Sequence, residues 1–155
     1  MGVMRLLCLF LVFTGLIACG SVNDTKNAKG EKKLRVVIMV YSGRADDPSY
    51  LLADSHLATQ MKDLIGKTRE TKFNGQTIIP SILGYRGIIV QNPGGISGLP
   101  EHFAVYKGMI EIMGKEKSFR NDEGRKLETL LITEARREKV IDDKLIRHMN
   151  IYVGK

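Results

Sequence analysis

Residues 85–113, YRGIIVQNPGGISGLPEHFAVYKGMIEIM, contain two apolar segments separated by a loop rich in glycine and proline. The first segment, residues 85–91, is rich in β-branched side chains and predicts a strand that ends at the NPGG sequence. Residues 103–113 suit either a helix or a strand, but Gly108 and the β-branched side chains favour a strand. Because the loop between the segments is short, we expect the two strands to pair antiparallel.

Upstream of these strands, residues 34–41 (LRVVIMVY) predict another buried strand. Residues 50–65 carry apolar side chains at helical spacing, with Ser49 placed to cap the start of the helix and Gly66 its end. Residues 77–79 are expected to form a short extended piece before Pro80.

Downstream, a helix is expected after Asn121 and Asp122, with its apolar positions on one face. A last short helix should be capped by Asp142 or Asp143, and residues 151–153 are expected to form a short strand or to fray. The order is strand, helix, short extended piece, two strands, two helices. It predicts an α+β fold: a two-layer sandwich with a small, mainly antiparallel sheet and helices on one face.

The chain has 155 residues, 24 lysines and arginines against 17 acidic residues, and a formal net charge of +7. This length suits one domain. Basic residues are interleaved with acidic ones, and no run of five like charges occurs. The charge pattern therefore argues against nucleic acid as a partner.

Residues 1–18 have the three parts of a signal peptide: Arg5 near the start, an apolar run over residues 6–13, and small residues at the end. The apolar stretch is too short for a bilayer-spanning helix, which needs about 20 residues. A buried N-terminal helix is the alternative, but such a helix would normally carry a polar face.

The end of this segment, LIAC at residues 16–19, resembles the lipobox of bacterial lipoproteins. The resemblance implies cleavage before Cys19, acylation of its thiol by chains such as palmitate, and attachment of the protein to a membrane of the bacterial cell envelope. The alternative is ordinary secretion, because Ala18 and Gly20 also suit a general signal peptidase that would cut before Ser21. No cysteine follows Cys19, so the exported body has no disulfide.

After this point, residues 21–33 are polar and predict a flexible tether. We therefore expect three regions. Residues 1–18 form the signal peptide, residues 19–33 the lipid anchor and tether, and residues 34–155 a single α+β domain.

Two arginines, each beside a glycine at a strand end, are candidates for binding an anion. Arg44 follows the first predicted strand and Arg86 opens the second, with Tyr50 and Tyr85 as possible walls of the pocket. The ligand would be an anionic small molecule or an acidic group of an envelope protein. In the alternative interpretation, the arginines tie loops together through Asp46, Asp47 or backbone carbonyls.

Motifs for catalysis, metals and cofactors are absent from the sequence. It has no HExxH, CxxC, GxSxG or Walker loop, and His56, His102 and His148 are far apart. We therefore expect a non-enzymatic binding module with no metal and no cofactor. The alternative is a small envelope hydrolase with a site of Arg44, Arg86, Asp47 and His102, which would require these side chains to converge.

Three segments resemble those of a family of small exported α/β proteins. They are SGR with the following Pro48 and Tyr50, then LGYRG at residues 83–87, and DEGRKLE at residues 122–128. The first is one residue longer than the family pattern, and Tyr50 stands where tryptophan is common. The resemblance implies a single domain and no particular activity.

Overall fold

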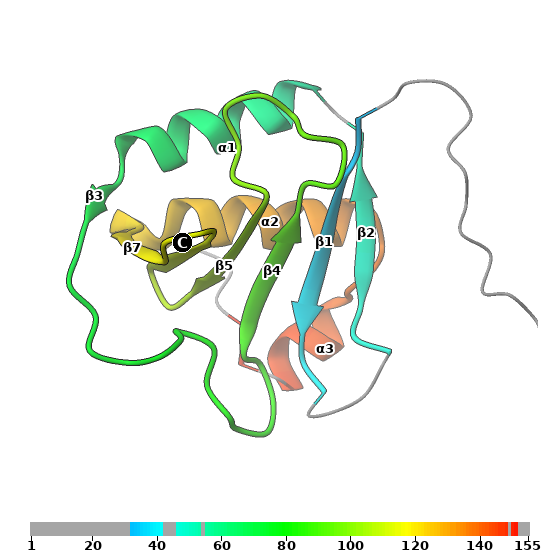
Figure 1. The fold of residues 1–155 in the computed structure, drawn as a ribbon. Helices are drawn as coiled ribbons and strands as arrows, with labels where there is room; N and C mark the ends of the chain where they lie inside the picture. Colours follow the sequence, from blue (N-terminus) through cyan, green and yellow to red (C-terminus); the bar gives the residue numbers. More distant parts are fainter. Residues whose placement is uncertain (1–31, 42–45, 54, 149, 152–155) are drawn as a thin grey trace, which may run out of the picture.

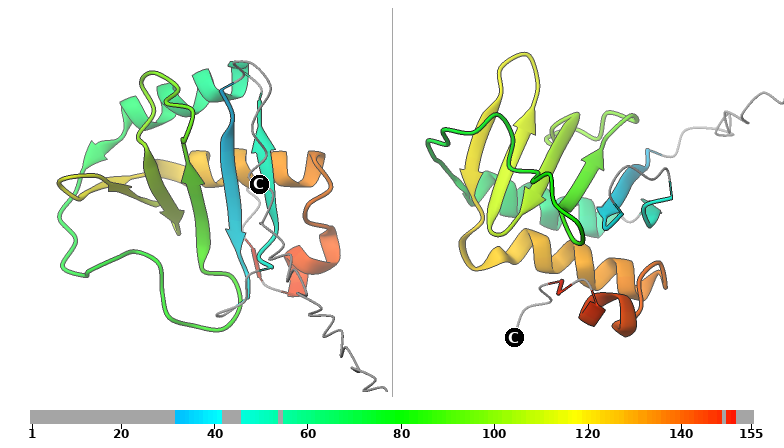
Figure 2. Two further views of the ribbon diagram at one scale, coloured as in Figure 1. Left: turned by 45° about the vertical axis from the view of Figure 1, so that its right-hand side comes forward. Right: turned by 90° about the horizontal axis from the view of Figure 1, so that it is seen from below.

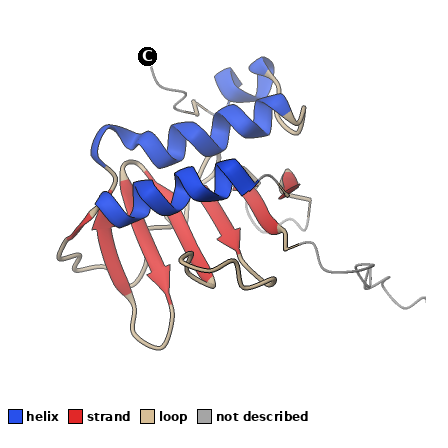
Figure 3. Ribbon diagram, turned by 90° about the horizontal axis from the view of Figure 1, so that it is seen from above, coloured by secondary structure: helices blue, strands red, loops and turns tan. Residues whose placement is uncertain are grey.

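The computed structural model describes residues 32–41, 46–53, 55–148 and 150–151. They form one seven-stranded sheet with three helices, and all neighbouring strands in the sheet are antiparallel (Figure 1). Figures 2 and 3 show the helices gathered on one face of the sheet. The predicted α+β two-layer sandwich is therefore confirmed.

The sheet order is β2-β1-β4-β5-β6-β7-β3. Its strands are β1 Leu34–Met39, β2 Ser49–Leu52, β3 Arg69–Glu70, β4 Gly87–Gln91, β5 His102–Tyr106, β6 Met109–Met113 and β7 Ser118–Asn121. The helices are α1 Ser55–Lys67, α2 Lys126–Arg137 and α3 Asp143–His148, with a single 3-10 turn, η1 Glu123–Arg125, before α2.

The core lies between the sheet and the helices. Leu34, Val36 and Ile38 of β1 are fully buried, whereas the residues between them are exposed or partly exposed. This alternation follows from the two-residue period of a strand and marks one covered face. Met61 of α1 and Leu131 of α2 are also fully buried and belong to the same apolar cluster.

The strands predicted over residues 34–41 and 85–91 are confirmed as β1 and β4, and β4 pairs antiparallel with β5. The prediction of one strand over residues 103–113 was wrong, because this segment is the hairpin β5–β6. Lys107 and Gly108 have φ of 47° and 79°, as a two-residue hairpin turn requires. The turn was not predicted from the sequence, because apolar side chains flank it on both sides.

The helix predicted over residues 50–65 begins only at Ser55. Tyr50 and Leu52 instead lie in edge strand β2, which pairs with β1, and Ser49 is the first residue of this strand rather than a helix cap. Pairing with β1 decides the local structure here, since Tyr50 and Leu52 fit the buried face of the sheet. The helix also continues one residue past Gly66.

Residues 77–79 form no strand; they lie on the sheet face opposite the helices. The Glu111 carboxylate on β6 accepts hydrogen bonds from the Thr77 hydroxyl (2.6 Å) and the Ile78 amide (2.8 Å) and pairs with Lys117 Nζ (2.7 Å). Strands β3 and β7 were not predicted, because they are short and largely polar.

The expected capping carboxylates of the last two helices are present, although Arg125 rather than Asp122 occupies the N-cap position of α2. The Asp122 carboxylate accepts the backbone amides of Leu127 (3.1 Å) and Glu128 (3.2 Å) at the start of α2. Asp142 accepts the amide of Leu145 at 2.7 Å and caps α3. Residue 151 is buried and lies in no strand, while residues 152–153 lie outside the described residues.

No helix in the described part of the chain is long and apolar enough to cross a membrane. The predicted signal peptide, the cleavage site and Cys19 lie outside the described residues.

Candidate functional site

Two of the three resemblance segments meet at a buried carboxylate. Tyr85 Oη donates a hydrogen bond to Glu128 Oε1 (2.6 Å), and Arg125 Nε lies 2.8 Å from Glu128 Oε2. Glu128 is fully buried. Burial, together with the negative charge of Glu128, holds the pKa of Tyr85 well above its ordinary value, so its hydroxyl remains a donor. Tyr85 thus joins residues 83–87 to the start of α2.

The next residue, Arg86, connects to the first segment instead. Its Nη2 donates to the Tyr41 carbonyl (2.6 Å) and lies 3.6 Å from the Asp47 carboxylate. Asp47 Oδ1 also accepts the amides of Val40 (2.9 Å) and Tyr41 (2.7 Å). Arg86 therefore ties the end of β1 to the loop before β2, which is the geometry of the loop-tie alternative.

Among the described residues, the two tyrosines of the predicted anion pocket are directed to α2 rather than to Arg86. Tyr50 is buried and donates to the Leu131 carbonyl on α2 (3.0 Å), and burial raises its pKa above the ordinary value. Tyr85 is engaged with Glu128 as described, and Arg44 lies outside the described residues. The anion pocket therefore stays a prediction. Of its two arginines, the structure describes Arg86.

His102 lies far from this network. It opens β5 opposite Gln91, at the end of β4 that is remote from Arg86. Five residue steps along a strand correspond to about 16 Å. His102 Nε2 lies 3.7 Å from Glu101 instead. Arg86, Asp47 and His102 thus do not converge as the hydrolase alternative requires, and no group of three metal-ligating side chains occurs within the described ranges.

An open groove of about 540 Å³ lies where the end of β1 meets the turn between α2 and α3. We call it the distal groove. It is lined by Tyr41, Asp46, Pro48, Lys139, Val140, Asp142, Lys144, Leu145 and His148. Its lining mixes cations, carboxylates and an apolar floor. The sequence offered no signal for it, because its two walls are separated by about ninety residues and meet only in the folded chain.

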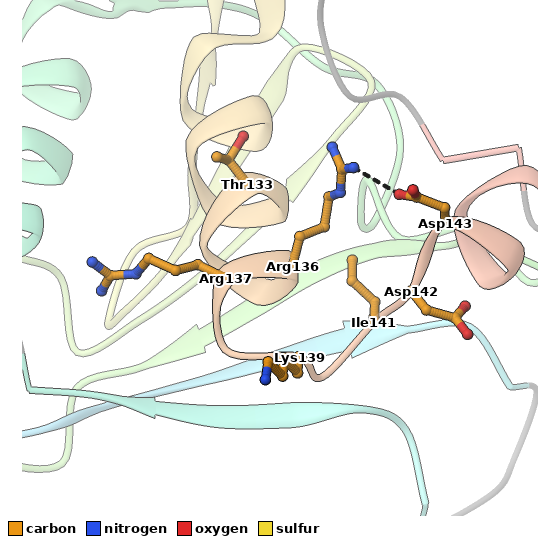
Figure 4. Close-up of a pocket in the computed structure, with 7 residues that line it drawn as sticks. All are labelled: Thr133, Arg136, Arg137, Lys139, Ile141, Asp142 and Asp143. Carbon is orange, nitrogen blue, oxygen red and sulfur yellow. Dashed lines mark hydrogen bonds and ion pairs between the residues drawn. The ribbon is translucent and has the colours of Figure 1, made fainter.

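A second hollow, of about 530 Å³, lies on the other side of the same turn and shares Lys139 and Asp142 with the distal groove (Figure 4). Arg136 points toward Asp143 and pairs with it at 2.7 Å. Arg137 points away from this pair and bonds to Glu134 on its own helix. Because both arginines have acidic partners, this hollow offers less free charge than the distal groove.

Comparison of the chain with protein-family models, curated proteins and solved structures found no match.

Proposed function

We propose that this protein is a lipid-anchored, non-enzymatic module of the bacterial cell envelope that binds an acidic segment of an envelope protein in the distal groove. The anchor rests on the apolar run at residues 6–13 and the LIAC sequence ending at Cys19. With two or three acyl chains on Cys19, membrane attachment would be stable, whereas one chain binds only marginally.

The observation that carries the binding proposal is the position of the groove relative to the tether. Lys32 Nζ donates to the Gly95 carbonyl (3.1 Å), beside the start of β1. Tyr41 of the groove lies beyond the other end of β1, and Pro48 lies beside Ile38 near that end, where its carbonyl accepts the Ile38 amide (2.8 Å). The six residues of this strand span about 20 Å. A body held by its tether at the first end would present the groove away from the anchoring surface.

The charges of the groove support an acidic partner. Within the described part of the chain, the ammonium groups of Lys139 and Lys144 form no ion pair. Of the two carboxylates in the lining, Asp142 is occupied in capping α3 and Asp46 is exposed, so two lysines face one unengaged carboxylate. Val140 and Leu145 supply an apolar floor that a peptide side chain can cover. A peptide with acidic and apolar side chains would complement both features.

Site-specific photo-crosslinking in cells tests this proposal. A photoreactive residue is introduced at Lys144 in the groove and, as a matched control, at Lys115, an exposed lysine in the β6–β7 connection. We expect a discrete protein adduct from position 144 that is absent at position 115. The adduct should fade when Lys139 is changed to glutamate, because the one lysine left in the groove is then replaced by an acid that repels an acidic partner. Equal labelling from both positions, or none from position 144, contradicts the proposal.

An anionic small molecule in the groove would instead give a lysine-dependent thermal shift without a protein adduct.

A further inference from the structure

A separate, smaller hollow lies at the corner of the body where the end of α1, strands β3 and β7 and the start of α2 meet. Figure 1 shows these elements at one edge of the sheet. We call it the corner hollow. Its volume of about 190 Å³ corresponds to the liquid volume of roughly six water molecules. Its lining residues are Leu64, Lys67, Thr68, Arg69, Asn121, Asp122, Glu123 and Lys126.

Three different elements each bring one cation to this hollow. Lys67 is the last residue of α1, Arg69 lies in β3 and Lys126 is the first residue of α2. Across residues 32–41, 46–53, 55–148 and 150–151, no ion pair or hydrogen bond of their charged groups is recorded. The three cations repel one another, and this repulsion would be relieved by an anion between them.

The acids of the hollow do not neutralise these cations fully. Both carboxylate oxygens of Asp122 accept the Leu127 amide at 3.1 Å, and Oδ2 also accepts the Glu128 amide at 3.2 Å. Asp122 is therefore directed to the start of α2. Glu123 is exposed and is the remaining acid among the lining residues. The corner hollow thus has an excess of cations over available carboxylates.

Neutral groups of the hollow add one further donor. Thr68 is occupied, because its hydroxyl donates to the Ile65 carbonyl at 2.6 Å. Asn121 is exposed in β7, opposite Arg69 of β3, and its side-chain amide has no recorded hydrogen bond to another described residue. A planar guanidinium, an amide and two mobile ammonium groups form a donor set that suits the oxygens of a tetrahedral anion.

We infer that the corner hollow binds a tetrahedral oxyanion, namely phosphate or sulfate, either free or as the terminal group of a larger molecule. This site is distinct from the distal groove, and the inference does not depend on the proposed function. The arginine supplies a bidentate contact, while the lysines at either side act as point charges on the remaining oxygens.

An NMR titration of the full chain in non-ionic detergent, at constant ionic strength, tests the inference. Inorganic phosphate and glycerol phosphate are the probes. We expect saturable shifts of the backbone amides of residues 67–69 and 121–126 with phosphate. Tighter binding of glycerol phosphate than of inorganic phosphate would assign the site to the terminal phosphate of a larger molecule. Equal affinities for the two probes would assign it to the free anion. Arg69→Gln and Lys126→Gln should each weaken binding about tenfold, which corresponds to the loss of one charge-assisted contact.

Two further variants make the result decisive. Lys115→Gln removes an exposed lysine elsewhere and should leave the affinity unchanged. Glu123→Gln removes the opposing carboxylate and should strengthen binding severalfold, an outcome that a damaged fold would not produce. The inference is overturned if the amides near the hollow do not shift, or if Lys115→Gln weakens binding as much as Arg69→Gln does.

Discussion

Replacing Tyr85 with phenylalanine removes one hydroxyl from the buried contact with Glu128 and leaves the ring in place. A hydrogen bond to a charged group contributes about 1.5–3 kcal/mol, so we expect the free energy of unfolding to fall by about 2 kcal/mol. For a body of this size, 1 kcal/mol corresponds to roughly 3 °C in the midpoint of thermal unfolding. The Tyr85→Phe variant should therefore unfold about 6 °C below the wild type.

Tyr106 provides a matched control for this experiment. Its ring lies 6.0 Å from that of Tyr85, centroid to centroid, but its hydroxyl has no recorded hydrogen bond among the described residues. Tyr106→Phe should therefore cost less than about 0.5 kcal/mol. In a Glu128→Gln background, the cost of Tyr85→Phe should shrink, because the acceptor is no longer charged. Equal losses from the two tyrosines, or an unchanged cost in that background, would refute the assignment of this contact.

The same contact predicts how stability changes in alkali. Burial and the charge of Glu128 raise the pKa of Tyr85 above its ordinary value of 10.0. Below pH 10 the hydroxyl is protonated in both the folded and unfolded chains, and the stabilisation is fully present. Above pH 10 the unfolded chain loses this proton first, so stability falls as pH rises. Urea unfolding between pH 8 and 11 should show a shallower decline in Tyr85→Phe than in the wild type.

Three other outcomes are expected. Burial acts to raise the pKa of Glu111, but the hydrogen bonds from Lys117, Thr77 and Ile78 outweigh it and hold the pKa below 4.5. The free energy of unfolding should therefore fall as pH drops below about 4.5. Glu111→Gln should make this decline shallower in acid-unfolding curves. Cys19→Ser should move the protein from the membrane fraction to the soluble fraction or leave it uncleaved, and unchanged membrane association of a processed chain would contradict the anchor. If Arg86 is a loop tie, Arg86→Ala should lower the unfolding midpoint with no dependence on phosphate, sulfate or acetate, whereas an anion-dependent rise in the wild type that the variant loses would support the predicted anion pocket.

Local pattern was enough for the elements whose form does not depend on distant parts of the chain. The β-branched run at residues 34–41 and the capped segment after Asp122 have one favourable local structure each, and both formed as expected. The antiparallel pairing of β4 with β5 also followed from the short loop between them. These features were sufficient to predict the fold class and the one-sided placement of the helices.

Tertiary contacts decided the rest. Tyr50 and Leu52 fit helical spacing as well as strand spacing, and only pairing with β1 and the bond from Tyr50 to Leu131 select the strand. The short strands β3 and β7 carry no strong local signal and exist because a neighbouring strand satisfies their backbone groups.

The roles of the arginines and the places of the candidate sites depend on the fold in the same way. The sequence left two roles for Arg86, binding an anion or tying loops together, and only the fold places the Tyr41 carbonyl and Asp47 beside it. Lys67, Arg69 and Lys126 are separated by up to 59 positions and meet only because β3 closes the sheet beside the start of α2. Sequence patterns report the preferences of neighbouring residues, whereas a site made of distant side chains depends on how the whole chain packs.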